Sequence, residues 1–265
     1  MTIFNRRAVR RHRDRAAAEF EHHSFLFRDV GERLTDRLDD IRRSFPQALD
    51  LGCHDGALDR LRNGRGGIET LFKCDISHQM ARRAGPLAVT ADEEFLPFAP
   101  ASFDLVLSNL SLHWVNDLPG ALAQLRRTLK PGGLLLAAML GGDTLKELRH
   151  ALAGAEIALE GGLSPRVSPF ADVRDAGDLL ARAGFIGTVA DSETITVSYG
   201  NPMALLADLR GMGETNAVIE SRKGFTSRAT IMRAMTDYQE TFTDEDGRLP
   251  ATFQVIYLTG WVPEG

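Results

Sequence analysis

The sequence predicts an α/β fold with a mostly parallel, seven-stranded sheet and helices on both of its faces. Five short apolar runs alternate with helical or loop stretches, which is the pattern of βαβ units. Two longer strand candidates follow near the end of the chain and bring the total to seven. The chain has 265 residues, of which 43% are hydrophobic and 25% charged, a composition typical of one globular domain with additions.

Two helices are expected before the first strand, over residues 6–20 and 28–43, and we assign residues 1–45 to an N-terminal helical extension. We interpret the arginines of the first helix as a solvated face, with an organelle transit peptide as the alternative. No apolar stretch typical of a secretory signal accompanies them. These arginines stand at positions 6, 7, 10, 11, 13 and 15.

The five short strands are expected over residues 47–52, 70–74, 87–90, 103–108 and 134–140. A helix over residues 119–129 has Pro119 in its first turn and ends before Lys130-Pro131-Gly132-Gly133. Open α/β sheets bind ligands beyond the carboxyl ends of their strands. The turns after these strands are therefore where a site is expected.

After the fifth strand, Thr144 and Glu147 fit a capping box at the start of a helix with one apolar face. A second helix is expected over residues 171–183, where Gly184 ends it. Residues 194–199 alternate between polar and apolar types, which predicts a strand with one wet face. Residues 253–261 are apolar at nearly every position, so this strand should lie between others.

The segment between these two strands looks helical over residues 202–213 and 227–241. We assign residues 201–249 to a helical lid over the ligand-binding edge of the sheet. Residues 46–200 and 250–265 then form the core domain.

The overall charge and the cysteine count exclude several classes of protein. A net charge of −5 gives no electrostatic reason to bind nucleic acid. Two cysteines make no disulfide framework, which favours a reducing compartment. The most apolar stretch, Gly132–Gly142, is far shorter than the ~20 residues of a membrane-spanning helix. Peripheral association with a membrane stays open.

The turn after the first strand carries the strongest local motif, Asp50-Leu51-Gly52-Cys53-His54-Asp55-Gly56. Glycines in such a turn let the backbone approach a ligand closely. The dinucleotide fingerprint G-x-G-x-x-G fails here at His54 and at Ala57. The stretch resembles instead the D-x-G-x-G-x-G turn of S-adenosylmethionine (SAM) methyltransferases, with His54 in place of the middle glycine. A plain strand-to-helix turn is the alternative.

Acidic residues follow the next two strands. Asp75 lies 75 − 50 = 25 residues after Asp50, close to the spacing of about 20 for a carboxylate that accepts hydrogen bonds from ribose hydroxyls. Its alternative role is the N-cap of the next helix. Asp92 and Glu93 follow the third strand, where a carboxylate can accept a hydrogen bond from an adenine amino group, or belong to a solvated turn. The other residues predicted to line the cofactor site are Cys53, Ile76, Asn109 and Leu110.

Taken in order, the glycine turn, the two acids, the FDLV strand and LKPGG resemble class I SAM-dependent methyltransferases over the first 140 residues. From Ile3 to Val262 the chain looks like the methyltransferase-fold assembly factors of respiratory complex I. The more distant resemblance is to the methyltransferase of early biotin synthesis, which esterifies a malonyl carrier protein. The motifs that carry the closer resemblance are ADEEFLPF, SLHWVNDLP, GGDTLKELR, DLRGMGETN and LPATFQVIYLTGW.

The resemblance implies an enzyme that binds SAM or S-adenosylhomocysteine and modifies a protein, with a complex I subunit as the partner. In that family the reaction is hydroxylation of an arginine, so methyl transfer and hydroxylation both stay open, as does methylation of a malonyl carrier protein. A non-catalytic chaperone that only holds a partner subunit is a further alternative. The location implied is the cytoplasm of a bacterium, or the inner-membrane side of the mitochondrial matrix in a eukaryote.

Four residues outside the cofactor motifs are candidates for the chemistry. His113 follows the fourth strand at the ligand-binding edge, where it would act as a general base or simply pack beside Trp114. Glu214 and Asp143 are candidates to pair with a substrate guanidinium, or are charged residues of surface loops. No metal site is predicted, since His12-Arg13-Asp14 is remote from the sheet edge and two cysteines alone do not hold zinc.

Overall fold

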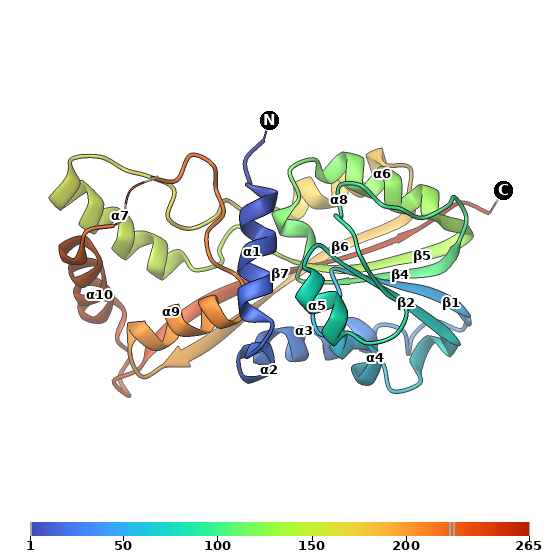
Figure 1. Ribbon diagram of the computed structural model, residues 1–265, viewed down its shortest axis with the longest axis horizontal. Helices are drawn as coiled ribbons and strands as arrows, with labels where there is room; N and C mark the ends of the chain where they lie inside the picture. The colour runs from blue at the N-terminus through green and yellow to red at the C-terminus, as the bar shows by residue number, and fades with distance from the viewer. Residues whose placement is uncertain (1, 223, 225, 265) are drawn as a thin grey trace.

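The computed structural model describes residues 2–222, 224 and 226–264. In this part of the chain seven strands form one sheet in the order β3-β2-β1-β4-β5-β7-β6, which confirms the predicted class (Figure 1). The strands are β1 (Gln47–Leu51), β2 (Thr70–Asp75), β3 (Ala88–Thr90), β4 (Phe103–Asn109), β5 (Leu129–Leu140), β6 (Ile186–Tyr199) and β7 (Leu249–Trp261).

The first five strands run parallel, so their carboxyl ends meet at one edge of the sheet. β7 is antiparallel to both of its neighbours, β5 and β6. Its position between them confirms the prediction from its apolar sequence. β6 lies at the edge of the sheet, and Thr194, Thr196 and Ser198 are exposed while Ile195 and Val197 are half-buried. The alternating sequence predicted this wet face.

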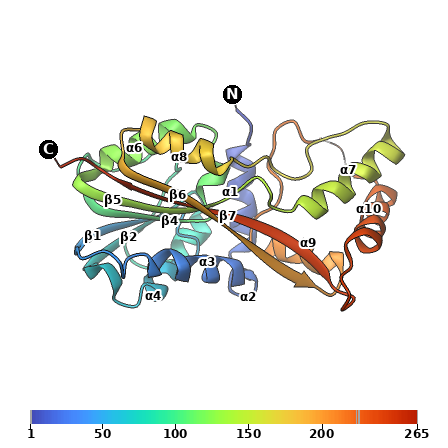
Figure 2. The same cartoon turned by 180° about the vertical axis from the view of Figure 1, so that it is seen from behind.

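Helices cover both faces of the sheet, each over its own hydrophobic cluster (Figures 1 and 2). α6 (Leu118–Thr128) and α8 (Val173–Arg182) bury Leu122 and Leu180 on one face. The other face is covered by α3 (Phe25–Asp36), α4 (Ala57–Leu61) and α5 (His78–Arg83).

The antiparallel pair of β6 and β7 extends beyond the other strands, and three helices gather around its far end (Figure 2). α10 packs along α7 and also contacts α9 and β7. α1 stands between this group and the helices on the main sheet (Figure 1), where it contacts α5 and α9. The bounds are α1 (Arg6–Ala16), α7 (Lys146–Glu160), α9 (Pro202–Gly211) and α10 (Arg228–Phe242), with the short α2 (Phe20–His23) after α1.

The structure corrects the predicted capping box. Leu145, not Thr144, precedes α7, and it has no capping side chain. Thr144 donates its hydroxyl to the backbone oxygen of Gln254, while the Glu147 carboxylate accepts from the backbone and the hydroxyl of Thr252. Both polar groups therefore bind β7 instead of the helix end. Likewise, β5 begins at Leu129, so the predicted stop sequence belongs to the strand.

Across the described residues, no helix has both the length and the apolar character that a membrane crossing requires.

Candidate functional site

The glycine turn after β1 is packed against the protein itself. Gly52 has a left-handed backbone with φ +68°, and a Cβ added there would collide with the Ser111 side chain. The backbone N–H groups of Gly52 and Cys53 both donate to the carbonyl of Cys74, at 2.7 and 2.9 Å. The close approach that requires glycine is thus made by the loop after β4.

His54 fills the space beside this turn. Its ring stacks on Phe20, with centroids 5.4 Å apart and planes 6° apart, and meets Phe27 edge-on at 4.5 Å. Burial, with a contribution from Arg13, lowers the pKa of His54 well below its usual range, so the ring is neutral. The cavity left here measures about 10 Å³, which holds at most about one water molecule.

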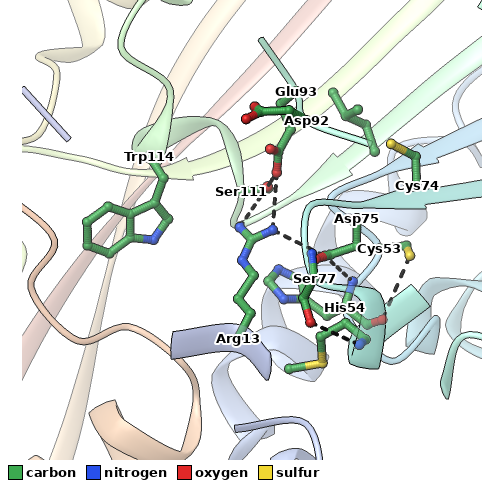
Figure 3. Close-up of polar contacts among 12 residues, drawn as sticks. Arg13, Cys53, His54, Cys74, Asp75, Ser77, Asp92, Glu93, Ser111 and Trp114 are labelled. Atoms are coloured by element: carbon green, nitrogen blue, oxygen red, sulfur yellow. Dashed lines mark hydrogen bonds and ion pairs between the residues drawn. The ribbon is translucent and has the colours of Figure 1, made fainter. Parts of the chain in front are cut away.

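Asp75 ends β2 as predicted, but both of its oxygens already accept hydrogen bonds from the protein. One accepts from the Ser77 backbone at 2.7 Å, and the other from the His54 backbone and from Arg13 Nη1, each at 3.1 Å (Figure 3). Ser77, not Asp75, caps α5, because its side chain accepts from Met80 N. The carboxylate expected to face a ribose faces an arginine instead.

Glu93 is the centre of a buried ion cluster. It pairs with Arg13 at 3.1 Å and with Arg6, and the Ser111 hydroxyl donates to it at 2.5 Å. Burial alone would raise the pKa of Glu93, but Arg13 and Arg6 hold it down at about 2. Arg6 also pairs with Asp92, at 2.6 Å. The two acids predicted to face adenine are therefore neutralised by the N-terminal helix.

The solvated face predicted for α1 is wrong for Arg6 and Arg13. Arg13 is fully buried, and Arg6 is mostly buried, whereas Arg7, Arg10, Arg11 and Arg15 are exposed. Arg6 and Arg13 lie seven residues apart, which is two helical turns, on the face that also buries Val9 and Ala16. That spacing within an apolar face is the feature in the sequence that indicated their burial.

The other predicted cofactor residues gather at the same strand ends. Asp50 is buried, and neither of its oxygens has a hydrogen-bond partner among the described residues. Asn109 donates to the Phe27 carbonyl at 2.7 Å, and Ile76 is buried in a small apolar cluster with α1. Gly56 begins α4 with φ +75°. The predicted site is thus assembled, but Arg13 and His54 occupy its space, and as folded it does not accommodate SAM.

A larger cavity of about 370 Å³ adjoins this cleft, with Phe27 lining both. Its volume is within the range of small-ligand sites. Its walls are mostly apolar and come from α3, β5, α7 and α9, and from the segment after α9. Side chains that line it include Leu26, Leu110, Trp114, Leu148, Phe170, Met212 and Glu214.

Glu214 supplies the carboxylate of this cavity. Trp114 Nε1 and His113 Nε2 both approach its Oε2, at 2.9 and 3.0 Å. The Leu140 N–H points at His113 Nδ1 at 3.5 Å, so the hydrogen-bond pattern places the proton of His113 on Nε2. Glu214 Oε1 is buried and has no partner among the described residues. Asp143, the other candidate for a guanidinium, is exposed and does not line the cavity.

The sequence predicted His113 beside Trp114 and named Trp114 and Glu214 as substrate or lid residues, but gave no sign that His113 contacts Glu214. Glu214 lies 101 residues from His113, and only the tertiary fold brings them together. Within the described ranges, no three His, Cys, Asp or Glu side chains cluster in a way that would hold a metal ion.

Known proteins match this chain in sequence, some of them over nearly its whole length. A family model described as a methyltransferase domain matches residues 49–137. The mitochondrial arginine-hydroxylase NDUFAF5 of Homo sapiens is 45% identical over 98% of this chain and 77% of that protein. The malonyl-[acyl-carrier protein] O-methyltransferase of Methylovorus sp. is 36% identical over 99% of this chain and 90% of that protein.

Solved structures with low identity share the fold. The YcgJ protein of Bacillus subtilis superposes with a TM-score of 0.60 at 14% identity, over 88% of this chain and 98% of that one. Phosphoethanolamine N-methyltransferase 2 of Haemonchus contortus, solved in complex with S-adenosyl-L-methionine, superposes with a TM-score of 0.52 at 17% identity. That match covers 89% of this chain and 52% of the other.

Proposed function

This chain belongs to the family of arginine-hydroxylase NDUFAF5, and we propose that it modifies an arginine side chain of a protein. The malonyl-[acyl-carrier protein] O-methyltransferases are more distant relatives. Hydroxylation, the activity in the name of its more similar relatives, is the reaction we favour, and its oxygen atom would come from an external oxidant such as O₂ with a two-electron donor. The protein substrate we expect is a subunit of respiratory complex I, as the resemblance of the whole chain implies.

The observation that carries this proposal is the unpaired oxygen of Glu214. A buried carboxylate oxygen without a partner is costly unless a donor reaches it. The cavity offers apolar walls for the methylene groups of an arginine, and aromatic rings for its planar head. Oε1 would then accept a charge-assisted hydrogen bond from the guanidinium.

His113 acts in this proposal through Glu214. His113 and Trp114 both donate to Oε2 of Glu214. These two contacts fix the carboxylate and leave Oε1 free to bind the substrate. A general base needs a free nitrogen within reach of the reacting group, and here Nε2 faces Glu214 while Nδ1 faces the Leu140 backbone. We therefore propose His113 as a positioning residue instead of the base that its place after β4 suggested.

SAM belongs to this proposal as the ligand of the first cleft, by which we mean the space at the glycine turn lined by Asp50, Gly52 and His54. The methyltransferase-domain match and the acids Asp75 and Asp92 at their strand ends support it. When bound, SAM would supply an electrophilic methyl group. Arg13 and His54 occupy the cleft as folded, so SAM has no space there until they move.

Methyl transfer to a carboxylate is a second candidate, favoured by a specific feature of the large cavity. Arg166 and Arg210 line it together with Glu214. Arginines of this kind bind carboxylates, such as the free end of a malonyl group. Arg166, however, already pairs with Glu156 at 2.5 Å, which leaves Arg210 as the more available cation.

Co-expression of the chain with complex I subunits, followed by peptide mass spectrometry, tests the proposal. An arginine that gains one oxygen atom supports hydroxylation, and one that gains a methyl group supports arginine methylation. A methyl ester on a malonyl carrier protein in the same cells would favour the second candidate. Arginines that stay unchanged in every subunit would contradict the proposal.

Two variants of the chain make the assay specific to the cavity. Glu214→Gln keeps the shape of the side chain and removes its charge, so the modification should be lost. Asp143→Asn makes the same chemical change at an exposed position outside the cavity and should leave the modification intact.

A further inference from the structure

Arg13 donates to Asp75, the carboxylate that would accept hydrogen bonds from the ribose of SAM. We propose that α1 competes with the cofactor for this position. In this view SAM binds only after α1 has withdrawn Arg13 from Asp75 and Glu93. The inference rests on the SAM-binding part of the proposed function. It concerns the chain's own residues and needs no assumption about the reaction.

The guanidinium of Arg13 is held by polar side chains at the strand ends, where a bound ligand would be held. Its guanidinium contacts Asp75 and Glu93 through Nη1 and Ser111 through Nη2, at 3.1, 3.1 and 2.9 Å (Figure 3). These partners come from the ends of β2 and β3 and from the loop after β4. Arg13 thereby spans the carboxyl ends of three strands, the place where open α/β sheets bind their ligands.

α1 buries few large apolar side chains. Ala8 and Val9 belong with Phe4 to a small hydrophobic cluster apart from the two that cover the sheet, whereas Ala16 joins one of those two. Four arginines on its outer side are exposed. Separation of α1 therefore exposes less apolar surface than separation of α3, which buries Leu26, Phe27, Val30 and Leu34.

The exchange of Arg13 for SAM balances the polar groups of the cleft. Withdrawal of Arg13 alone would leave Asp75 and Glu93 buried without their charged partner, which is costly. Ribose hydroxyls would donate to Asp75 in its place, and the adenine amino group would donate to the acids that follow β3. Cofactor entry and helix release are thus expected to occur together, so each drives the other.

Binding of S-adenosylhomocysteine, measured by titration calorimetry, tests the competition. Its sulfur is neutral, so removal of the Arg13 charge does not raise its affinity through lost repulsion of a sulfonium. Arg13→Gln should bind it about tenfold more tightly than the wild type, or better, because fewer contacts must break. Arg11→Gln makes the same change at an exposed position of α1 and should bind like the wild type.

Hydrogen exchange on the wild-type chain gives a second readout that does not depend on a variant that may unfold. At saturating S-adenosylhomocysteine the α1 amides should exchange faster than in the free protein. Equal affinities of the wild type and Arg13→Gln, no binding by either, or α1 amides equally or better protected by the ligand would each overturn the competition. The co-expression assay reads arginine modification independently, so a failure here leaves that proposal to its own test.

Discussion

At the scale of single residues, the large cavity depends on how one carboxylate is held. Trp114 and His113 place two donors on Glu214 Oε2 and leave Oε1 without a partner. Glu214 is thereby oriented by residues from the loop after β4, although it belongs to the segment after α9.

Substitution of His113 separates positioning from base catalysis. His113→Ala removes one donor from Glu214, and the affinity for an arginine-containing peptide should fall by about 10- to 100-fold, since a hydrogen bond to a charged group is worth about 1.5–3 kcal/mol. His113→Gln restores an amide donor and should recover most of that affinity and of the turnover rate. A glutamine variant that binds the peptide normally but has lost turnover would identify His113 as the base after all.

The sequence predicts much of the first cleft, because its residues follow strands that the apolar pattern locates. Asp75 and Asp92 are where strand ends should place them. The occupant of the cleft was missed because the charge run of α1 suggested solvent, although Arg6 and Arg13 share an apolar face. Contacts such as His113 with Glu214 join distant segments, and no local pattern encodes them.

At the scale of elements, α1 links the two cavities. On one side Arg13 reaches the acids of the first cleft. On the other side His12 Nδ1 lies 3.0 Å from the Thr215 carbonyl, and the Asn5 backbone donates to Ala217 at 2.8 Å. The segment that carries Glu214 is therefore fastened to the same helix. Movement of α1 would change the cofactor cleft and the wall of the large cavity together.

A substitution at the N-cap of α1 can destabilise the state in which Arg13 is bound to Asp75 and Glu93, without changing a residue of the cleft. Asn5 accepts a hydrogen bond from the Ala8 backbone at 3.1 Å, and loss of such a cap costs about 1 kcal/mol. Asn5→Ala should therefore raise the affinity for S-adenosylhomocysteine by up to about fivefold, measured by calorimetry. Asp172→Ala removes the side-chain cap of α8 and provides the control, since α8 packs on α6, β6 and β7 and does not line the first cleft. Unchanged affinity in Asn5→Ala would indicate that α1 stability does not limit binding.

At the scale of the whole molecule, the long antiparallel pair of β6 and β7 joins two groups of helices. The main sheet with its two helical faces carries the first cleft, while α7, α9 and α10 surround the extended end of this strand pair (Figure 2). The large cavity is lined from both groups, by Leu26 and Leu110 on one side and by Leu148 and Leu209 on the other. The sequence indicated each strand and most helices, but not this division, since the length of β6 beyond residues 194–199 has no apolar pattern.

The pH dependence of global stability tests the buried end of β1. Burial raises the pKa of Asp50 from 3.8 to about 8, so the folded chain keeps a proton that the unfolded chain releases. Stability from this group is complete below pH 3.8 and is lost as the pH rises toward 8, with a slope of at most about 1.4 kcal/mol per pH unit. His54 acts in the opposite sense below its ordinary pKa, because its folded form resists protonation.

Comparison of the unfolding free energies of the wild type and Asp50→Asn separates the contribution of Asp50 from those of the other titratable groups. Asp50→Asn has no proton to release, so its unfolding free energy, measured by urea titration, should fall less than that of the wild type between pH 5 and about 8. Asp40→Asn alters an exposed aspartate and should keep the wild-type slope. If Asp50→Asn and the wild type run parallel across this range, Asp50 is ionised in the folded chain. Lys73, the cation that opposes its burial, would then hold that charge.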